Sequence, residues 1–313
     1  MKSPDTGSKR PQVIAVVGPT ASGKTSLSIN LALRLPGEII CCDSRTIYKY
    51  MDIGTAKPTA EEQRGVPHHM LDVVEPDRVY SVAEFQKCGS RHIDDIIARG
   101  KTPIICGGTG FYSRALLEGL SIPEVPPQEE LREKLKQEAE QAGNESLHER
   151  LRRLDPISAE RIMINDRFRI IRALEVSLVT GRPFSAVAQK VDVPFDVIWI
   201  GLSFEDRGVL RRRIEDRLCV QMAAGLVDET RRLVDRYGET QPLLNAVTYR
   251  QMIKFLRGEW SIEEAIDDCI KHNYQLARKQ MMWFRSNPQT KWFLVDKSED
   301  VEKDVIAYIE SIL

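Results

Sequence analysis

The sequence predicts an α/β protein in which a parallel β-sheet core carries an all-helical insertion. Short β-rich runs alternate with stretches of helical periodicity over the first 110 residues, which indicates right-handed crossovers and a parallel sheet. The proline-rich stretch "IPEVPP" then opens a segment with helical periodicity alone. We therefore expect these parts: a disordered tail at 1–11, a core formed by 12–121 and 191–313, and a helical insertion at 122–190.

The expected elements follow from local signals along the chain. "QVIAVV" (12–17) is a strand, and the helix at 24–35 ends at Pro36-Gly37. "EIICC" (38–42) is a buried strand followed by a long polar loop at 45–69. Further elements are expected in this order: a helix at 82–100 opened by a Ser81/Glu84 capping box, a strand at 102–106, a strand within 191–204, mostly helix from 205 onward, and a strand at 291–296.

Composition and charge argue against a globally basic, a membrane-spanning, a secreted and a zinc-binding protein. The formal net charge is −1, so a basic surface for nucleic acid has to be local. No apolar run approaches the ~20 residues needed to cross a membrane, and the polar start of the chain lacks a signal-peptide core. Cys41, Cys42 and Cys106 lie in apolar runs typical of a reduced cytosolic protein, and His68-His69 lack a second ligand pair for zinc.

The stretch "GPTASGKT" (18–25) predicts a phosphate site. It has the spacing G-x-x-x-x-G-K-[ST] between an expected strand and an expected helix. Loop amides and the helix N-terminus stabilise anionic oxygens there. Lys24 adds a positive charge, and the Thr25 hydroxyl is a candidate ligand for Mg²⁺. The candidate phosphate-binding residues are Gly18, Thr20, Ala21, Ser22, Gly23, Lys24 and Thr25.

Asp43 is the acid expected beside this loop. It follows the strand "EIICC" at the carboxyl edge of the sheet, where ligands of open α/β folds bind. The strand at 102–106 ends in glycines instead of the acid usual in nucleotide hydrolases. Asp43 could hold Mg²⁺ or take a proton from an acceptor, and a solvated carboxylate without function is the alternative.

Several further motifs resemble one family. After "GPTASGKT" come "DSRTIYKYMDIGTAKPT", "VPHHMLD", "GGTGFY", "DRFRIIRALEV", "GLVDE" and "KQMMWFR", in the order seen in tRNA dimethylallyltransferases, also called tRNA isopentenyltransferases. The resemblance spans about 12–285 and implies a P-loop-kinase-like core with a helical insertion. It also implies Mg²⁺-dependent transfer of a dimethylallyl group from dimethylallyl diphosphate to the N6 amine of an adenosine beside the anticodon of tRNA.

The resemblance assigns roles in the transfer chemistry. The phosphate loop would hold the diphosphate that leaves, and Asp43 would be the general base for the attacking amine. Thr109 would assist at that amine, with capping of the next helix as the alternative. Arg213 and Arg217 lie four residues apart, so they share a helical face for the diphosphate. Arg217 is the first choice as a catalytic residue, and a solvated basic face is the alternative.

The resemblance also implies tRNA contacts. The expected tRNA-binding residues are Asp43, Ser44, Arg45, Thr46, Thr109, Arg132, Arg167, Phe168, Arg169, Arg172, Arg278 and Lys279. For the arginines at 167–172, the alternative is helix surface paired with Asp166 and Glu175. Trp283 and Phe284 lie in a basic, aromatic stretch suited to RNA, but we expect both in the core.

The sequence departs from the family pattern at a few positions. Thr46 replaces a common Gln, Thr248 a usual Gly, Asn273-Tyr274 a usual Thr-Arg, and Met282 a usual Thr. These changes bear on the RNA contacts and leave the transfer chemistry untouched.

Two other functions compete with the prenyltransferase interpretation. A small-molecule P-loop kinase shares the nucleotide-binding loop, a strand-end acid and a helical insertion, and it consumes ATP. A non-catalytic RNA-binding module would only sense a nucleotide. We expect a cytoplasmic monomer that acts on the anticodon stem-loop of tRNA, with Mg²⁺ as its cofactor and without zinc or membrane contact.

Overall fold

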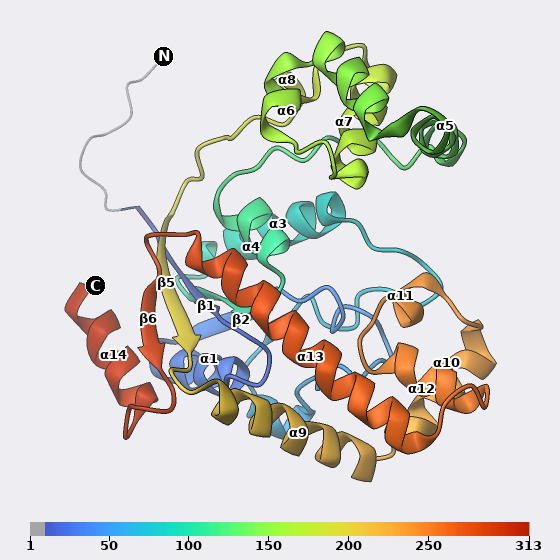
Figure 1. Ribbon diagram of the computed structural model, residues 1–313. Helices are drawn as coiled ribbons and strands as arrows, with labels where there is room; N and C mark the ends of the chain where they lie inside the picture. The colour runs from blue at the N-terminus through green and yellow to red at the C-terminus, as the bar shows by residue number, and fades with distance from the viewer. Residues whose placement is uncertain (1–9, 313) are drawn as a thin grey trace, which may run out of the picture. The chain divides into compact units, whose positions relative to one another are not determined.

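The computed structural model, described here for residues 10–312, has a six-stranded parallel sheet with the strand order β3-β2-β4-β1-β5-β6 (Figure 1). The expected tail at 1–11 falls largely on residues 1–9, which lie outside the described residues. The strands are β1 (Gln12–Val17), β2 (Gly37–Cys41), β3 (His68–His69), β4 (Thr102–Gly107), β5 (Asp196–Ser203) and β6 (Lys291–Leu294). The predicted α/β class with a parallel sheet is therefore confirmed.

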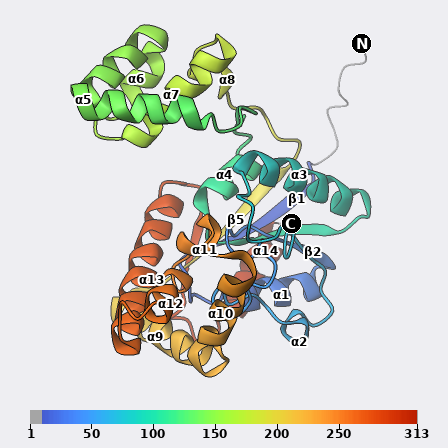
Figure 2. The same cartoon turned by 90° about the vertical axis from the view of Figure 1, so that its right-hand side faces the viewer.

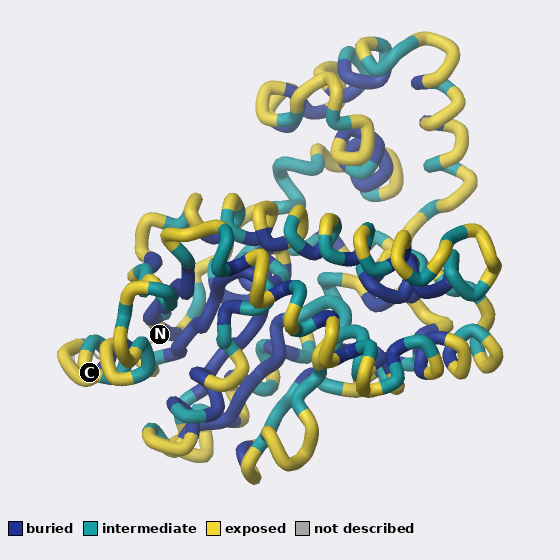
Figure 3. The backbone as a smooth tube through the Cα atoms, turned by 60° about the horizontal axis from the view of Figure 1, so that its bottom comes forward, coloured by how far each residue is buried: buried dark blue, intermediate teal, exposed yellow. Residues whose placement is uncertain are grey.

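Both faces of the sheet are buried, as the apolar strand sequences require. On β1, Val13, Ala15 and Val17 pack into one apolar cluster, whereas Ile14 and Val16 pack into the other. Because successive strand residues point to opposite faces, this alternation shows that helices cover both sides. Figure 3 shows the strands as the most continuously buried part of the core.

The helices of the core follow the expected order along the chain. They are α1 (Lys24–Arg34), α2 (Ala60–Gln63), α3 (Val82–Ala98), α4 (Gly110–Leu117), α9 (Arg207–Ala223), α10 (Leu226–Tyr237), α11 (Gln241–Leu244), α12 (Tyr249–Leu256), α13 (Ile262–Arg285) and α14 (Val301–Ile312). Helices α9, α10, α12 and α13 gather into one layer beside the sheet (Figure 2). The capping box of Ser81 and Glu84 opens α3 as predicted. Among the described helices, none has the length and apolarity to span a membrane.

The polar stretch at 45–69, expected as a loop, contains two short elements. Thr59 and Glu62 form a capping box that opens α2, which lasts a single turn. His68 and His69 add β3 to the sheet edge by pairing in parallel with Ile39 and Ile40. Neither element has an apolar repeat, so periodicity could not reveal them.

Residues Glu118–Asp192 form a compact unit of their own. It consists of α5 (Glu129–Leu154), α6 (Pro156–Arg161), α7 (Arg167–Thr180) and α8 (Phe184–Val187). Its apolar core includes Leu135, Leu151 and Ile170. The chain entering and leaving this unit pairs with itself, because the Ser121 amide donates to the Gln189 carbonyl at 2.8 Å.

A buried carboxylate stabilises the amino end of β2. Glu38 is 3% exposed and accepts bonds from Lys101 Nζ at 2.8 Å, Arg99 Nη2 at 2.6 Å and His69 Nε2 at 2.7 Å. Burial alone would raise the pKa of Glu38, but the bonds from Lys101 and His69 and the charge of Arg99 lower it to about 2. Glu38 is therefore a structural anion at the end of the strand opposite Asp43.

We expect Glu38→Gln to lower the free energy of unfolding by about 2 kcal/mol at neutral pH, the size of a lost set of charged hydrogen bonds. Because the folded pKa lies below the ordinary value of 4.5, the carboxylate stabilises the fold fully above that pH. Its contribution disappears as the pH falls toward 2. Urea unfolding from pH 7 to 2.5 measures this, and a constant difference between wild type and variant across that range would contradict it.

Candidate functional site

The phosphate loop lies between β1 and α1, and two glycines give it its shape. Gly18 has φ +145°, and a Cβ on it would lie 2.5 Å from the Leu202 carbonyl oxygen on β5. Gly23 has φ +90° and is the N-cap of α1. Glycine is required at both positions, because other residues rarely adopt these angles. The loop therefore turns tightly against the sheet and presents the N-terminus of α1 to its concave side.

Lys24 extends back along this loop, and its Nζ donates to the Pro19 carbonyl oxygen at 2.6 Å. Burial lowers the pKa of Lys24 to about 8, with a smaller contribution from the Arg217 guanidinium and against the opposing charges of Cys106 and Asp43. A lysine in this state is close to neutral at mildly alkaline pH. A bound anion would restore its charge.

We expect the KM for a diphosphate ligand to rise above pH 8, by up to ~10-fold per pH unit, because the neutral amine no longer attracts the anion. Initial rates at varied donor concentration between pH 7 and 9.5 measure this. Lys24→Arg is the control, since an arginine stays charged over that range. Its KM should be independent of pH, and an equal rise in both proteins would contradict the assignment.

Arg217 on α9 lies half-buried against the loop. Its Nη1 donates to Thr20 Oγ1 at 2.6 Å and its Nη2 to Asn273 Oδ1 at 3.3 Å, while its Nε is buried without a partner in the described structure. Burial lowers the pKa of Arg217. A buried donor without an acceptor is costly unless a ligand supplies one. Arg213, by contrast, is exposed and donates from Nε to the Ala21 carbonyl at 2.9 Å.

The loop opens into a cavity of about 530 Å³, here called the phosphate cavity. Besides the loop from Thr20 to Thr25, it is lined by residues that include Asp43, Thr46, His68, Gly107 and Arg217. The Thr25 hydroxyl and the Asp43 carboxylate are hard oxygen donors, and they face this cavity beside a phosphate loop. Such donors suit Mg²⁺, which prefers oxygen ligands.

A second cavity of about 360 Å³ adjoins the first, here called the Asp43–Thr109 pocket. It is lined by residues from α4, α9 and α13 and by the loops that follow β2 and β4. Five residues line both cavities: Thr20, Asp43, Thr55, Gly108 and Arg217. The two spaces therefore meet at Asp43 and Arg217.

The side chains around Asp43 are held by backbone bonds. Asp43 Oδ1 accepts from the Arg45 amide at 2.7 Å, and Thr109 Oγ1 accepts from the Ser44 amide at 3.0 Å. Thr109 thus links the glycine turn after β4 to the end of β2. This arrangement fixes an acid and a hydroxyl at the same wall of the pocket.

The expected RNA-contacting residues fall in different places. Ser44, Arg45 and Lys279 line the Asp43–Thr109 pocket, and Arg278 lines another cavity of about 560 Å³ beside α9 and α13. Thr46 instead lines the phosphate cavity, with its hydroxyl buried and unpartnered in the described structure. Their contact with tRNA stays a prediction.

The candidates in the helical unit mostly have protein partners. Fully buried Glu175 pairs with Arg132 at 2.8 Å and with Arg172 at 2.6 Å, and Arg169 pairs with Asp166 at 3.3 Å. Of the other two, Arg167 donates to Asn144 Oδ1 at 2.8 Å, while Phe168 is 78% exposed. The local pairs of Arg169 and Arg172 are the helix pairing that sequence reasoning held as the alternative. The bonds of Arg132 and Arg167 hold α5 to α7.

Sequence reasoning missed several residues of the pocket. Gln280 on α13 is 8% exposed, and its Oε1 accepts from the Thr20 amide at 2.7 Å, so it ties α13 to the phosphate loop. Gly54 and Thr55 line the pocket from the far side of the 43–58 loop. The motifs "MDIGT" and "KQMMWFR" contained these residues, but no spacing rule gave them a role.

Of the adjacent aromatic residues on α13, Phe284 lies in the core and Trp283 lines the pocket. Phe284 is 3% exposed and packs in the core as predicted. Trp283 was expected in the core too, but it is only half-buried and lines the pocket, packed close to Gly110 and Phe111. Adjacent residues of a helix point in different directions, so when Phe284 faces the core, Trp283 points away from it.

Two departures from the family pattern occupy informative positions. Asn273 is buried and accepts the bond from Arg217, so it touches the candidate diphosphate site. Thr248 is buried with φ +91°, a conformation that suits glycine, and it opens α12 through a capping box with Gln251. This positive φ explains why the family pattern has a glycine at this position.

Fold and site together define a phosphate-loop α/β protein whose anion cavity opens onto a second polar pocket beside an aspartate. The profile of the IPP transferase family matches residues 46–287. A tRNA dimethylallyltransferase of Thermomicrobium roseum is 46% identical over 91% of this chain and 87% of its own.

Solved structures give the same result. A tRNA isopentenylpyrophosphate transferase of Bacillus halodurans is 37% identical, with a TM-score of 0.72 over 97% of this chain and 96% of its own. A eukaryotic dimethylallyltransferase crystallised as it acts on tRNA is 26% identical, with a TM-score of 0.80 over 96% of this chain and 78% of its own. The chain belongs to the IPP transferase family.

Proposed function

We propose that the chain transfers a dimethylallyl group from dimethylallyl diphosphate to the N6 amine of an adenosine adjacent to the anticodon of tRNA and releases diphosphate. The junction of the two cavities at Asp43, Thr20 and Arg217 carries this proposal. One cavity suits a diphosphate and the other a flipped base, and the two meet at a single acid. Relatives over nearly the whole chain bear the name of this activity.

The diphosphate end of the donor would occupy the phosphate cavity. Loop amides, Lys24 and the unpartnered Nε of Arg217 would bind its oxygens. These groups stabilise the transition state more than the ground state, because negative charge accumulates on the leaving diphosphate as the allylic C–O bond breaks. Mg²⁺, held by the Thr25 hydroxyl, would neutralise part of that charge when bound.

The adenine would enter the Asp43–Thr109 pocket after leaving the stack of the anticodon loop. Its N6 attacks the allylic carbon, and the electron pair of the C–O bond leaves with the diphosphate. A proton from N6 passes to Asp43, whose Oδ1 is already held by the Arg45 amide. The Thr109 hydroxyl lies at the same wall and would orient the amine.

The kinase alternative has less support. Asp43 and the phosphate loop fit either reaction, but the family profile and the relatives point to a prenyltransferase. The two functions differ in their donor. A kinase would transfer the terminal phosphate of ATP to a small acceptor and would have no use for an allylic diphosphate.

Incubating the purified chain with labelled dimethylallyl diphosphate, Mg²⁺ and an anticodon stem-loop tests the function directly. We expect the label on one adenosine beside the anticodon, with one diphosphate released per label. A stem-loop with guanosine at that position is the matched control and should stay unlabelled. ATP-dependent phosphorylation of a small molecule, without label in the RNA, would establish the kinase instead.

A further inference from the structure

One wall of the Asp43–Thr109 pocket is made of irregular backbone. Gly54 and Thr55 line it, and they belong to the loop between β2 and α2, outside any strand or helix. Such a loop needs tertiary contacts to hold a fixed shape, since backbone order costs entropy. The contacts that hold residues 52–54 come from helices far along the chain.

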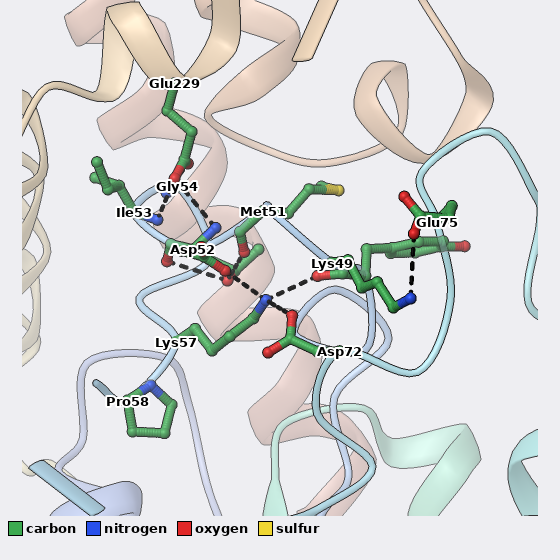
Figure 4. A network of polar contacts seen from close by, with 12 residues as sticks. Lys49, Met51, Asp52, Ile53, Gly54, Lys57, Pro58, Asp72, Glu75 and Glu229 are labelled. Carbon is green, nitrogen blue, oxygen red and sulfur yellow. Dashed lines mark hydrogen bonds and ion pairs between the residues drawn. The ribbon is translucent and has the colours of Figure 1, made fainter. Parts of the chain in front are cut away.

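Glu229 on α10 accepts three consecutive backbone N–H groups from this turn. Its Oε2 accepts from Asp52 at 3.2 Å and from Ile53 at 2.9 Å, and its Oε1 accepts from Gly54 at 3.0 Å. Figure 4 shows the carboxylate of Glu229 directed at the turn, with dashed lines to Ile53 and Gly54. Glu229 is 5% exposed, so water cannot replace it as the acceptor. Consecutive amides of this kind form a concave anion site, here filled by the protein's own carboxylate.

Tyr249 at the start of α12 completes this arrangement. Its hydroxyl donates to Glu229 Oε1 at 2.6 Å and accepts from the Gly54 amide at 3.2 Å. Burial and the Glu229 carboxylate raise the pKa of Tyr249 well above its ordinary value, so the hydroxyl keeps its proton. A Cβ on Gly54 would lie 2.5 Å from the Tyr249 ring, so the turn has no room to shift toward α12.

The same turn is fixed from two other directions. Gln221 Nε2 on α9 donates to the Ile53 carbonyl at 2.6 Å. Gln221 lies one helical turn after Arg217, so a single helix contacts both the phosphate loop and the turn. Buried Lys57 donates to Asp52 Oδ1 at 2.6 Å and to Asp72 Oδ1 at 2.5 Å (Figure 4). The backbone at 52–54 is thus held by side chains of α9, α10 and α12 and by Lys57, though Glu229 itself lines neither cavity.

We propose that Glu229, supported by Tyr249, is a positioning residue for the acceptor nucleotide. By fixing the amides of residues 52–54, it sets the distance between the Gly54–Thr55 wall and the Thr109 wall, and so the pose of the base at Asp43. This inference rests on the proposed function, because it concerns the base that the pocket receives. It predicts a much larger effect on the RNA substrate than on the diphosphate donor, because Gly54 lines the Asp43–Thr109 pocket alone and only Thr55 reaches the phosphate cavity.

Glu229→Gln tests the inference, because the amide keeps the size of the side chain but presents an N–H₂ group to donors. We expect kcat/KM for an anticodon stem-loop to fall by ~10- to 100-fold, the usual cost of misplacing a reacting group by about 1 Å. The KM for dimethylallyl diphosphate should change by less than about threefold, since the phosphate loop is untouched. Tyr249→Phe removes the two hydrogen bonds of the hydroxyl, to Glu229 and from Gly54, and should lower kcat/KM for the RNA about 2- to 10-fold.

Glu38→Gln is the matched control, because Glu38 is equally buried and hydrogen-bonded but lies at the opposite end of β2. Glu38→Gln should lower the free energy of unfolding without changing kcat/KM for the RNA or the KM for dimethylallyl diphosphate. Should Glu229→Gln fail to fold, Tyr249→Phe carries the test alone. Wild-type kcat/KM for the RNA in the folded Glu229→Gln and Tyr249→Phe proteins would overturn the positioning role. Failure of the wild type to label RNA would instead overturn the proposed function, and this inference with it.

Discussion

Asp43→Asn is expected to lower kcat for dimethylallyl transfer by about 10²-fold or more, the usual contribution of a general base. Asparagine has nearly the same shape and still accepts the Arg45 amide, so the loop after β2 should keep its fold. It cannot take the proton that N6 loses. Binding of the stem-loop and of the diphosphate donor should therefore survive while turnover collapses.

Single-turnover kinetics with labelled donor, together with RNA binding measured by fluorescence anisotropy, separate these effects. Asp77→Asn is the matched control, since Asp77 is exposed in the loop before α3 and lines neither cavity. It should behave as wild type. A folded Asp43→Asn protein with a near-normal single-turnover rate would remove Asp43 from the role of base.

Arg217→Gln is expected to lower kcat/KM for the diphosphate donor by about 10²- to 10³-fold, as does loss of a donor aimed at developing charge. Arg217 donates to Thr20 of the phosphate loop, and its Nε is buried without a protein acceptor in the described structure. The variant loses that positive charge beside the leaving group. Both kcat and the KM for the donor should change, because the charge acts on bound substrate and on the transition state.

Arg212→Gln provides the comparison, because Arg212 is exposed on the same helix with a 4.0 Å ion pair to Asp206. Surface pairs of this kind contribute little, so its kinetics should be unchanged. Arg213→Gln should have an effect between these two, since Arg213 donates to the backbone of Ala21 in the loop but is exposed and lies over the Phe204 ring. Equal losses in all three variants would indicate a general field of positive charge in place of a specific contact by Arg217.

Much of the core could be read from local pattern. The strands at 12–17 and 102–106, the Ser81 capping box and the spacing of Gly18 with Gly23 all depend on neighbours a few residues away. The position of Asp43 beside the phosphate loop followed from the rule that parallel strands end at one edge of the sheet. These features are local, or they follow from topology common to all such sheets.

Other parts of the site could not be read in this way. Gln280 reaches Thr20 across 260 residues, and Glu229 reaches Gly54 across 175. Trp283 lines the pocket although its helical spacing suggested the core. Arg132 was expected at the RNA, and its bond to buried Glu175 is a contact set by the packing of α5 on α7. Such contacts depend on how distant helices pack.

The sequence by itself determined the parallel α/β core, the phosphate loop, the acid beside it and the family, because each is written in short motifs. Only the tertiary structure decided that the phosphate cavity and the Asp43–Thr109 pocket share a wall, and that Glu229 and Tyr249 hold that wall's backbone. The physical reason is that irregular loops have no repeat of their own. Their shape comes from hydrogen bonds with groups that the chain brings together only when it folds.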